Sequence, residues 1–320
     1  MIWTRYWKMN NREHNFISNV VYIYNNEKEI DYFLTKIANC MVDNFEHSEI
    51  ICVNDGSTDK SLEEIKKFAE KRKADRLSIS VINMNQYHGM EKAMSAGVDL
   101  SIGDFVFEFD KISRGYGEKE ILMVYQKALT GYDIVSAGIN RTENLSSVIF
   151  YKLFNTLFES ENNLQSEDFR ILSRRAINRV KSITERTYYR KAIYANCGLK
   201  QCYCLYENNP KNINKENTKS KYRVEMATDA LILFTKVGYY AAIIMTFLMA
   251  VILIGVLIYA IALKIVSNPV PGWTSTICFL AFCFLGIFIV SAIIMKYLQV
   301  IVELLFKKKE CLFESVEKIK

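Results

Sequence analysis

Glu49-Ile50-Ile51-Cys52-Val53-Asn54-Asp55-Gly56-Ser57-Thr58-Asp59 joins an apolar run to a polar turn. The run Ile50 to Val53 is typical of a strand buried on both faces, and Gly56 permits a sharp turn after it. A helix is predicted from Asp59 to Lys73, with Ser57 or Thr58 as its cap. Ligands of open α/β sheets bind beyond the carboxyl ends of the strands, so Asn54 and Asp55 are candidate ligand contacts. An ordinary βα turn has the same pattern, and the residues alone leave both interpretations open.

The same alternation of strand and helix continues on both sides of this stretch. Strands are predicted at Asn19–Tyr24, Ile50–Val53, Leu77–Met84, Asp104–Phe109 and Asp133–Ala137, and helices at Lys28–Val42, Asp59–Lys73, Met90–Leu100 and Glu118–Leu129. Strands that alternate with helices at this spacing predict an α/β domain with a doubly wound, mostly parallel sheet.

Two long segments without charge follow the predicted α/β domain. Val237–Leu263 and Ser267–Met295 contain no charged residue, and each exceeds the ~20 residues that cross a bilayer. They predict a hairpin of transmembrane helices over 237–263 and 273–297, joined by a periplasmic connection over 264–272. Two buried core helices are the alternative, which the length of the runs disfavours. Basic residues before the first span and after the second predict that both termini are cytoplasmic.

The remaining segments complete the expected domain organisation. A tail is expected over 1–18, the α/β domain over 19–219, a juxtamembrane amphipathic helix over 220–236 and a cytoplasmic tail over 298–320. An amphipathic helix is predicted over Ser147–Phe158, and it could lie at the membrane surface or in the core. A further helix is predicted over Ser173–Val180, and a mobile loop over Asn208–Lys219.

Composition excludes several classes of function. The 320 residues carry a net charge of +6 and eight cysteines. Cys197, Cys202 and Cys204 have no partners at zinc-site spacing and are expected to be small apolar residues in a reducing compartment. No interleaved basic and aromatic platform is present, so binding of nucleic acid is not expected. The positive residues near the predicted spans favour anionic lipid instead.

The order of motifs along the chain resembles a known family. The motifs are Val20-Val21-Tyr22-Ile23-Tyr24-Asn25-Asn26-Glu27, Val53-Asn54-Asp55-Gly56-Ser57-Thr58-Asp59, Gly89 with Ala93 and Gly97, Gly131-Tyr132-Asp133-Ile134-Val135, Asp168-Phe169-Arg170-Ile171-Leu172-Ser173-Arg174-Arg175 and Ser220-Lys221-Tyr222. Together with the terminal hairpin they resemble glycosyltransferase family 2, in particular the polyprenyl-phosphate glycosyltransferases related to dolichol-phosphate mannose synthase and bactoprenol glucosyltransferases. The resemblance implies a GT-A fold that moves a sugar from a nucleotide donor to a lipid phosphate.

The resemblance also implies roles for individual residues. Asp110 matches the first Asp of the Asp-x-Asp metal motif, and Asp168 matches the candidate catalytic base. The nucleotide sugar is expected to contact Tyr24, Asn25, Glu27, Asn54, Asp55 and Lys111, and the lipid phosphate to contact Arg170, Arg174 and Lys221.

Structural roles are the alternatives for several of these residues. Asp55 could cap the following helix, and Asp168 could form a structural ion pair with Arg170. Arg174 and Arg175 could lie on a solvated helix face, and Lys221 could anchor the chain at the membrane interface.

Three departures from the family pattern bear on activity. Asn26 replaces a Glu, Asn54 replaces an Asp, and Ile112 replaces the second Asp of the metal motif. Glu108 lies two residues before Asp110 and therefore shares its face of the strand, so the pair is a candidate site for Mg²⁺ or Mn²⁺. Alternatively, Lys111 neutralises the diphosphate without metal, or catalysis is lost.

The expected protein is a multi-pass glycosyltransferase of a bacterial inner membrane. It would transfer one sugar, with inversion, from a nucleotide sugar to undecaprenyl phosphate on the cytoplasmic face, for modification of surface polysaccharide or lipopolysaccharide. The rival is a non-catalytic GT-A module that binds a nucleotide or scaffolds a membrane complex. A processive polysaccharide synthase is a weaker interpretation, since two membrane spans are too few to enclose a channel for translocation of the polymer. The membrane hairpin could pack against a second copy, which would give a homo-oligomer.

Overall fold

The structure, a computed structural model, describes the sheet domain in most detail. The described residues are 12–73, 76–139, 151–152, 155–156, 164–183, 189–195, 197–207 and 313–318, with single positions between 244 and 301. The chain divides into two units. The first contains Met1–Lys152, Ser160–Met226 and Lys309–Lys320, and the second contains Leu153–Glu159 and Ala227–Lys308.

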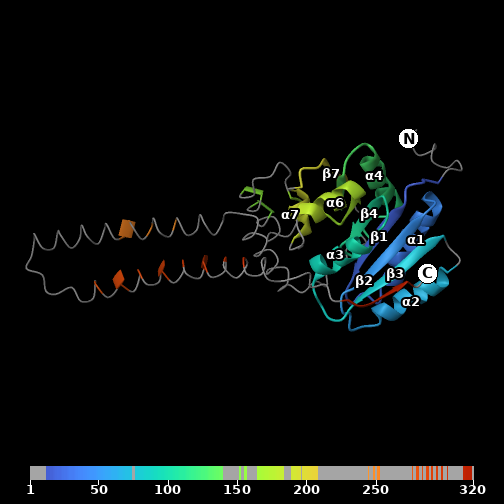
Figure 1. Ribbon diagram of the computed structural model, residues 1–320, viewed down its shortest axis with the longest axis horizontal. Coiled ribbons are helices and arrows are strands. Elements are labelled where there is room, and N and C mark those ends of the chain that lie inside the picture. Colours follow the sequence, from blue (N-terminus) through green and yellow to red (C-terminus); the bar gives the residue numbers. More distant parts are fainter. Residues whose placement is uncertain are drawn as a thin grey trace, which may run out of the picture. The chain divides into compact units, whose positions relative to one another are not determined.

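A mixed sheet forms the centre of the first unit (Figure 1). Its strands are β1 Ile17–Ile23, β2 Ser48–Asn54, β3 Leu77–Met84, β4 Phe105–Phe109, β5 Ile134–Ile139, β6 Phe169–Ser173, β7 Gln201–Tyr206 and β8 Phe313–Lys318. They lie in the order β7-β5-β6-β4-β1-β2-β3-β8. The neighbours among β1 to β4 are parallel, and β7 is parallel to β5. β6 runs antiparallel to β4 and β5, and β8 runs antiparallel to β3.

Helices cover both faces of the sheet. Side chains of α1 Ile30–Asn44, α2 Ser61–Lys71 and α4 Glu118–Leu129 share one apolar cluster with Val21, Cys52 and Phe107 of the strands. Side chains of α3 Met90–Leu100, α6 Arg174–Ile183 and α7 Arg190–Ala195 share a second cluster with Val20, Val53 and Val106. Adjacent residues of a strand point to opposite faces, so strands β1 to β6 contribute side chains to both clusters.

A glycine allows α3 to lie close to the sheet. A Cβ atom at Gly97 would lie 2.7 Å from Val53 Cγ2 and nearer still to Val20 Cγ1. This close packing fixes α3, and with it the loop that leads into the helix, against β1 and β2.

The predicted strands and helices up to residue 137 are confirmed, with small changes at their ends. β3, α3 and α4 have the predicted bounds. The second helix begins at Ser61, not at Asp59, and the predicted Ser57 or Thr58 cap is wrong. Asp59 Oδ1 accepts a hydrogen bond from Ser61 N, whereas Ser57 Oγ accepts one from Asn25 N.

Two further strands differ from the predicted arrangement. β6 is antiparallel to its neighbours, so the sheet is mixed at one side. β8, red in Figure 1, lies within the segment 298–320 that the sequence predicts to be a tail. It pairs with β3 from Ser80 to Met84 and covers the edge that β3 would otherwise expose.

The predicted membrane segments lie largely beyond the described residues. This applies to the predicted helix over 147–158, the loop over 208–219, the helix over 220–236, the spans over 237–263 and 273–297 and the connection over 264–272. Within the part of the chain that the structure describes, no helix has both the length and the apolar character needed to span a bilayer.

Candidate functional site

The turns that follow β1 and β2 hold each other in place. Asn25 has a positive φ of 53°, its backbone N donates to Ser57 Oγ at 3.1 Å, and its Oδ1 accepts from Thr58 N at 2.8 Å. Glu27 Oε2 accepts from Lys60 N at 3.1 Å. Two residues predicted to contact a nucleotide sugar, Asn25 and Glu27, therefore use these side-chain oxygens to fix the turns that border the site.

Gly56 sits where the β2 turn meets the loop after β3. Its φ is 64°, and a Cβ atom there would lie 2.6 Å from the backbone carbon of Gln86. A side chain would be strained in this conformation and would also collide with the backbone. The predicted need for glycine at this turn is confirmed, and the close approach explains how the two loops pack.

Asp55 is fully buried and anchors the loop before α3. Its carboxylate accepts hydrogen bonds from Tyr22 OH at 3.0 Å, His88 N at 2.7 Å and Gly89 N at 2.9 Å. Burial raises the pKa of Asp55, although these hydrogen bonds act in the opposite direction. The alternative that Asp55 only caps the following helix is wrong, because its partners precede α3 and not α2.

Aromatic rings and an amide pair lie beside Asp55. The rings of Tyr24 and Tyr87 lie 4.7 Å apart at an interplanar angle of 56°. Asn54 Nδ2 donates to Asn83 Oδ1 at 2.7 Å. Stacking on aromatic rings and hydrogen bonding to amides are the interactions that bind a nucleobase, so this edge of the sheet suits the base of a nucleotide.

A buried charge cluster lies at the carboxyl end of β4. We use this name for Glu91, Glu108, Asp110, Glu167, Arg170, Arg190 and Lys191. Arg170 contacts carboxylate oxygens of Glu108, Asp110 and Glu167, each at 2.6 Å. Arg190 contacts Glu91 at 2.8 Å, Glu108 at 2.8 Å and Asp110 at 2.6 Å.

Strand geometry explains why these side chains meet. Glu108 and Asp110 are two residues apart and point to the α3 and α7 face of the sheet, as predicted. β6 pairs Arg170 directly with Glu108, which places the guanidinium beside both carboxylates. Glu91 projects from α3, and Arg190 begins α7, so the two helices on this face of the sheet add further charged side chains.

Electrostatics keeps two carboxylates of this cluster, those of Asp110 and Glu167, ionised. Burial alone would raise the pKa of Asp110, but the charges of Arg170 and Arg190 outweigh burial and hold that pKa well below its usual range. In the same way, Arg170 and Lys191 outweigh burial at Glu167 and lower its pKa. Asp110 and Glu167 are therefore charged at neutral pH.

Asp168 lies next to the cluster at the start of β6. Its Oδ2 accepts a hydrogen bond from Tyr206 OH at 2.8 Å, and its backbone N donates to Ala137 O at 2.8 Å. Burial, followed by the charges of Asp168 and Asp110, raises the pKa of Tyr116 well above its usual value. The structure thus brings Asp110, Asp168 and Arg170 to one corner, as the sequence predicts.

One of the predicted site residues has a different position, one cannot be placed, and a third, Lys111, remains beside Asp110. Arg174 lies at the opposite end of β4, where its side chain donates to Gly103 O at 2.9 Å and its backbone N donates to Asp104 O. The grouping of Arg174 with Arg170 is corrected, because β6 carries the chain away from the site between them. Lys221 lies outside the described residues. Lys111 follows Asp110 and is partly exposed.

Sequence reasoning missed four of the seven residues of the buried charge cluster, namely Glu91, Glu167, Arg190 and Lys191. Glu91 carried a usable signal, because it lies three residues before Met94 on the buried face of α3. Arg190 and Lys191 follow Tyr189 and precede Ile193 and Tyr194, and a charged pair within an apolar segment also suggests buried partners.

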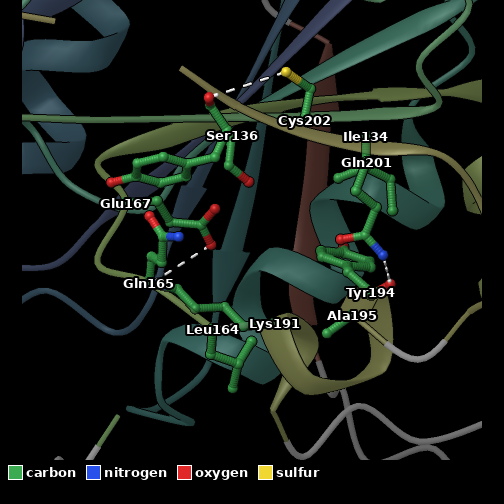
Figure 2. Close-up of a pocket in the computed structure, with 11 residues that line it drawn as sticks. Ile134, Ser136, Leu164, Gln165, Glu167, Lys191, Tyr194, Ala195, Gln201 and Cys202 are labelled. Carbon is green, nitrogen blue, oxygen red and sulfur yellow. Dashed lines mark hydrogen bonds and ion pairs between the residues drawn. The ribbon is translucent and has the colours of Figure 1, made fainter. Parts of the chain in front are cut away.

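A cavity opens beside the cluster, between β5, β7 and α7. Its volume is about 280 Å³, and Glu167, Lys191 and Tyr194 belong to its wall. Figure 2 shows Gln165 and Glu167 on one side of this cavity, with Tyr194 and Gln201 on the other. Lys191 Nζ lies 3.5 Å from Glu167 Oε1. The cavity thus gives a second molecule a polar approach to the same corner.

The fold and site define an α/β domain with a cluster of buried, paired charges at the carboxyl end of β4. Residues 18–111 match the family model described as Glycosyl transferase family 2. This match confirms, for these residues, the resemblance inferred from the motifs.

Several relatives share this similarity. An uncharacterised glycosyltransferase of Synechocystis sp. is 30% identical over 201 residues, covering 61% of this chain and 62% of that protein, which is less than two thirds of its length. A bactoprenol glucosyl transferase of Shigella phage SfX is 25% identical over 84% of this chain and 88% of its own. The mannosyltransferase PcManGT of Pyrobaculum calidifontis, solved with GDP-Man and Mn²⁺, aligns with a TM-score of 0.47 at 14% identity, over 71% of this chain and 65% of that one.

Proposed function

We propose that the chain transfers a glycosyl group from a nucleotide sugar to the phosphate of a polyprenyl lipid. The observation that carries this proposal is the meeting of Asp110, Asp168 and Arg170 at the carboxyl end of β4, where the segment 18–111 that matches the family 2 model ends. The bactoprenol glucosyl transferase of phage SfX, and an undecaprenyl-phosphate 4-deoxy-4-formamido-L-arabinose transferase of Aeromonas hydrophila that is 26% identical over 162 residues, support the acceptor class.

The proposed reaction is a direct displacement with inversion. An oxygen of the lipid phosphate attacks the anomeric carbon and forms a new C–O bond, while the bond from that carbon to the nucleoside diphosphate breaks. The diphosphate leaves with the electron pair. A phosphate oxygen is already anionic and needs no base, so Asp168, held by Tyr206, is assigned to orient the reacting groups.

Binding of the donor is assigned to the edge formed by β1, β2 and β3. Tyr24 and Tyr87 supply aromatic surface for the base, and Asp55 holds the loop over 86–89 through His88 N and Gly89 N. The cavity beside Lys191 is assigned to the approach of the acceptor, because it reaches the buried charge cluster from the β5 and β7 side.

The resemblance implies a Mg²⁺ or Mn²⁺ ion at Asp110 and Glu108, and the donor set does not fit one. Guanidinium groups contact both oxygens of Asp110 and one oxygen of Glu108. Ile112, where the family has its second Asp, offers no ligand. No step of the proposed reaction is therefore assigned to a metal.

Placement at a bacterial inner membrane, with the sheet domain on the cytoplasmic face, is part of the proposal. It is supported by the two uncharged runs and by apolar side chains exposed on helical positions of the second unit. These are Ile244, Leu248, Val251, Leu280, Ile287, Ile294 and Ile301. Their spacings of three, four and seven residues put each set on one helix face, as expected for contact with lipid tails.

One observation favours a second candidate, a binding module without catalysis. The charges of Asp110 and Glu108 are already compensated within the protein, which would also suit a domain that only binds a nucleotide and organises a membrane complex.

Sugar transfer separates the two candidates. Membranes containing the full chain would be incubated with a panel of radiolabelled nucleotide sugars and undecaprenyl phosphate, and the labelled lipid measured. The proposal expects transfer from one donor and a strong loss in Asp168→Asn. Donor binding without transfer from any donor would favour the binding module, and full turnover in Asp168→Asn would refute the role of Asp168.

A further inference from the structure

The two carboxylates at the end of β4 already have cations of their own. Asp110 Oδ1 lies 2.6 Å from Arg190 and Oδ2 lies 2.6 Å from Arg170. Glu108 Oε2 lies 2.6 Å from Arg170 and 2.8 Å from Arg190, and Oε1 accepts from Tyr194 OH at 2.7 Å. All four carboxylate oxygens are therefore engaged by side chains of the domain itself.

A divalent cation would have to displace these guanidinium groups. Mg²⁺ and Mn²⁺ need several free oxygen ligands around them. The side chains of Arg170 and Arg190 are only 1% and 2% exposed, so a displaced guanidinium would remain inside the protein without its partners. Among the described residues, no group of three or more acidic, His or Cys side chains is arranged to hold a metal.

The backbone fixes both cations at this place. Arg170 lies within the sheet, paired in register with Glu108. Arg190 is held twice by Glu91, whose Oε2 accepts from its backbone N at 3.0 Å and from its Nε at 2.8 Å. Two fixed positive charges also repel a divalent cation that approaches Asp110.

We infer that Arg170 and Arg190 occupy the place of the divalent cation, and that the chain binds its nucleotide donor without metal. This inference rests on the proposed function and deepens it, because it specifies the donor as a metal-free nucleoside diphosphate sugar. Lys111, which follows Asp110 beyond the end of β4, is partly exposed.

Two measurements on the detergent-solubilised full chain test the inference. The first titrates Mn²⁺ into the protein without nucleotide and follows free Mn²⁺ by electron paramagnetic resonance. The second measures binding of UDP and GDP by calorimetry, with excess chelator or with Mn²⁺. We expect no uptake of Mn²⁺ and equal nucleotide affinity in both conditions. Uptake of Mn²⁺ that Asp110→Asn abolishes, or nucleotide binding that chelator abolishes, would overturn the inference.

A gain of metal binding gives an independent check. Arg190→Gln leaves Glu91, Glu108 and Asp110 without their shared cation, and a set of buried carboxylates attracts a divalent ion. This variant is expected to take up Mn²⁺ and to become more heat-stable with it. Arg175→Gln is the control, because Arg175 pairs with Asp133 at the exposed far end of the sheet. A folded Arg190→Gln protein that ignores Mn²⁺ would count against the inference.

The outcomes also separate this inference from the proposed function. Failure of both UDP and GDP to bind under any condition would contradict nucleotide binding by the site. The Mn²⁺ titration of the wild-type protein would still decide whether the carboxylates accept a metal. If Arg190→Gln does not fold, that same titration decides the question without the variant.

Discussion

Removing the side chain of Arg190 should weaken the sheet domain more than any exposed ion pair can. Arg190 is 2% exposed and contacts Glu91, Glu108 and Asp110. Removing one partner of a buried ion pair costs about 3–5 kcal/mol, because the remaining charge is left without compensation. For a domain of this size, 1 kcal/mol corresponds to about 2–4 °C, so Arg190→Met should lower Tm by about 6–20 °C.

The assay can use cysteines that the fold hides. Cys40 and Cys52 are fully buried in the core of the sheet domain. Once the partly exposed cysteines, such as Cys202 and Cys204, have been blocked in the native protein, a fluorogenic maleimide reacts with Cys40 and Cys52 only when the domain opens. Its signal during heating then reports unfolding of the detergent-solubilised chain. Arg175→Met is the matched control, because the Arg175 side chain is 68% exposed and its partner Asp133 keeps a hydrogen bond from Ser173 Oγ when Arg175 is removed.

A double-mutant cycle tests whether the loss comes from the cluster. Glu91→Gln removes one of the carboxylates that Arg190 neutralises, so Glu91→Gln with Arg190→Met should cost less than the sum of the two single changes. We expect a coupling of about 1–3 kcal/mol between these neighbouring sites. Additive losses, or a Tm for Arg190→Met close to that of Arg175→Met, would refute the reasoning.

Three further predictions concern packing, pH and the orientation of Asp168. Gly97→Ala should cost about 1–3 kcal/mol, because its Cβ would collide with Val20 and Val53, and adding Val20→Ala should restore part of the lost Tm. Burial lowers the pKa of Lys36 from 10.5 to about 8. Between these two pH values the unfolded chain binds more protons than the folded chain, so the contribution of Lys36 to the free energy of unfolding rises with pH. The Tm difference between wild type and Lys36→Met should therefore move in favour of wild type from pH 8 to pH 10, and no movement would contradict it. Tyr206→Phe removes the hydrogen bond to Asp168 and should lower the rate of sugar transfer without changing donor affinity. If Tyr206→Phe lowers that rate by the same factor when Asp168→Asn is already present, Tyr206 does not act through Asp168.

Local patterns in the sequence predict most of the elements around the site. The apolar run before Asn54 identifies β2, and helical spacing identifies α3 and α4 with their observed bounds. The two-residue period of a strand is sufficient to place Glu108 and Asp110 on one face. The family motifs add Asp168 and Arg170, which the structure brings to the same corner.

Long-range pairing could not be predicted in the same way. The direction of β6 depends on how the chain returns to the sheet after residue 139, and that direction separates Arg174 from Arg170 although they are four residues apart. Arg190 is recognisable as a charge in an apolar segment, but its partners lie 80 and 99 positions earlier in the chain. Such contacts depend on tertiary structure and leave no periodic signal.

The pairing of β8 with β3 constrains how the chain can meet a membrane. β8 follows the second unit in the sequence, yet it hydrogen-bonds within the same sheet as strands that precede that unit. A sheet cannot continue through a bilayer to its other side, so β7 and β8 lie on the same side of any membrane that the chain meets. Between these two strands the chain therefore crosses a bilayer an even number of times or not at all. A single span between β7 and β8 is incompatible with this sheet, and two spans are the smallest number of crossings that satisfies it.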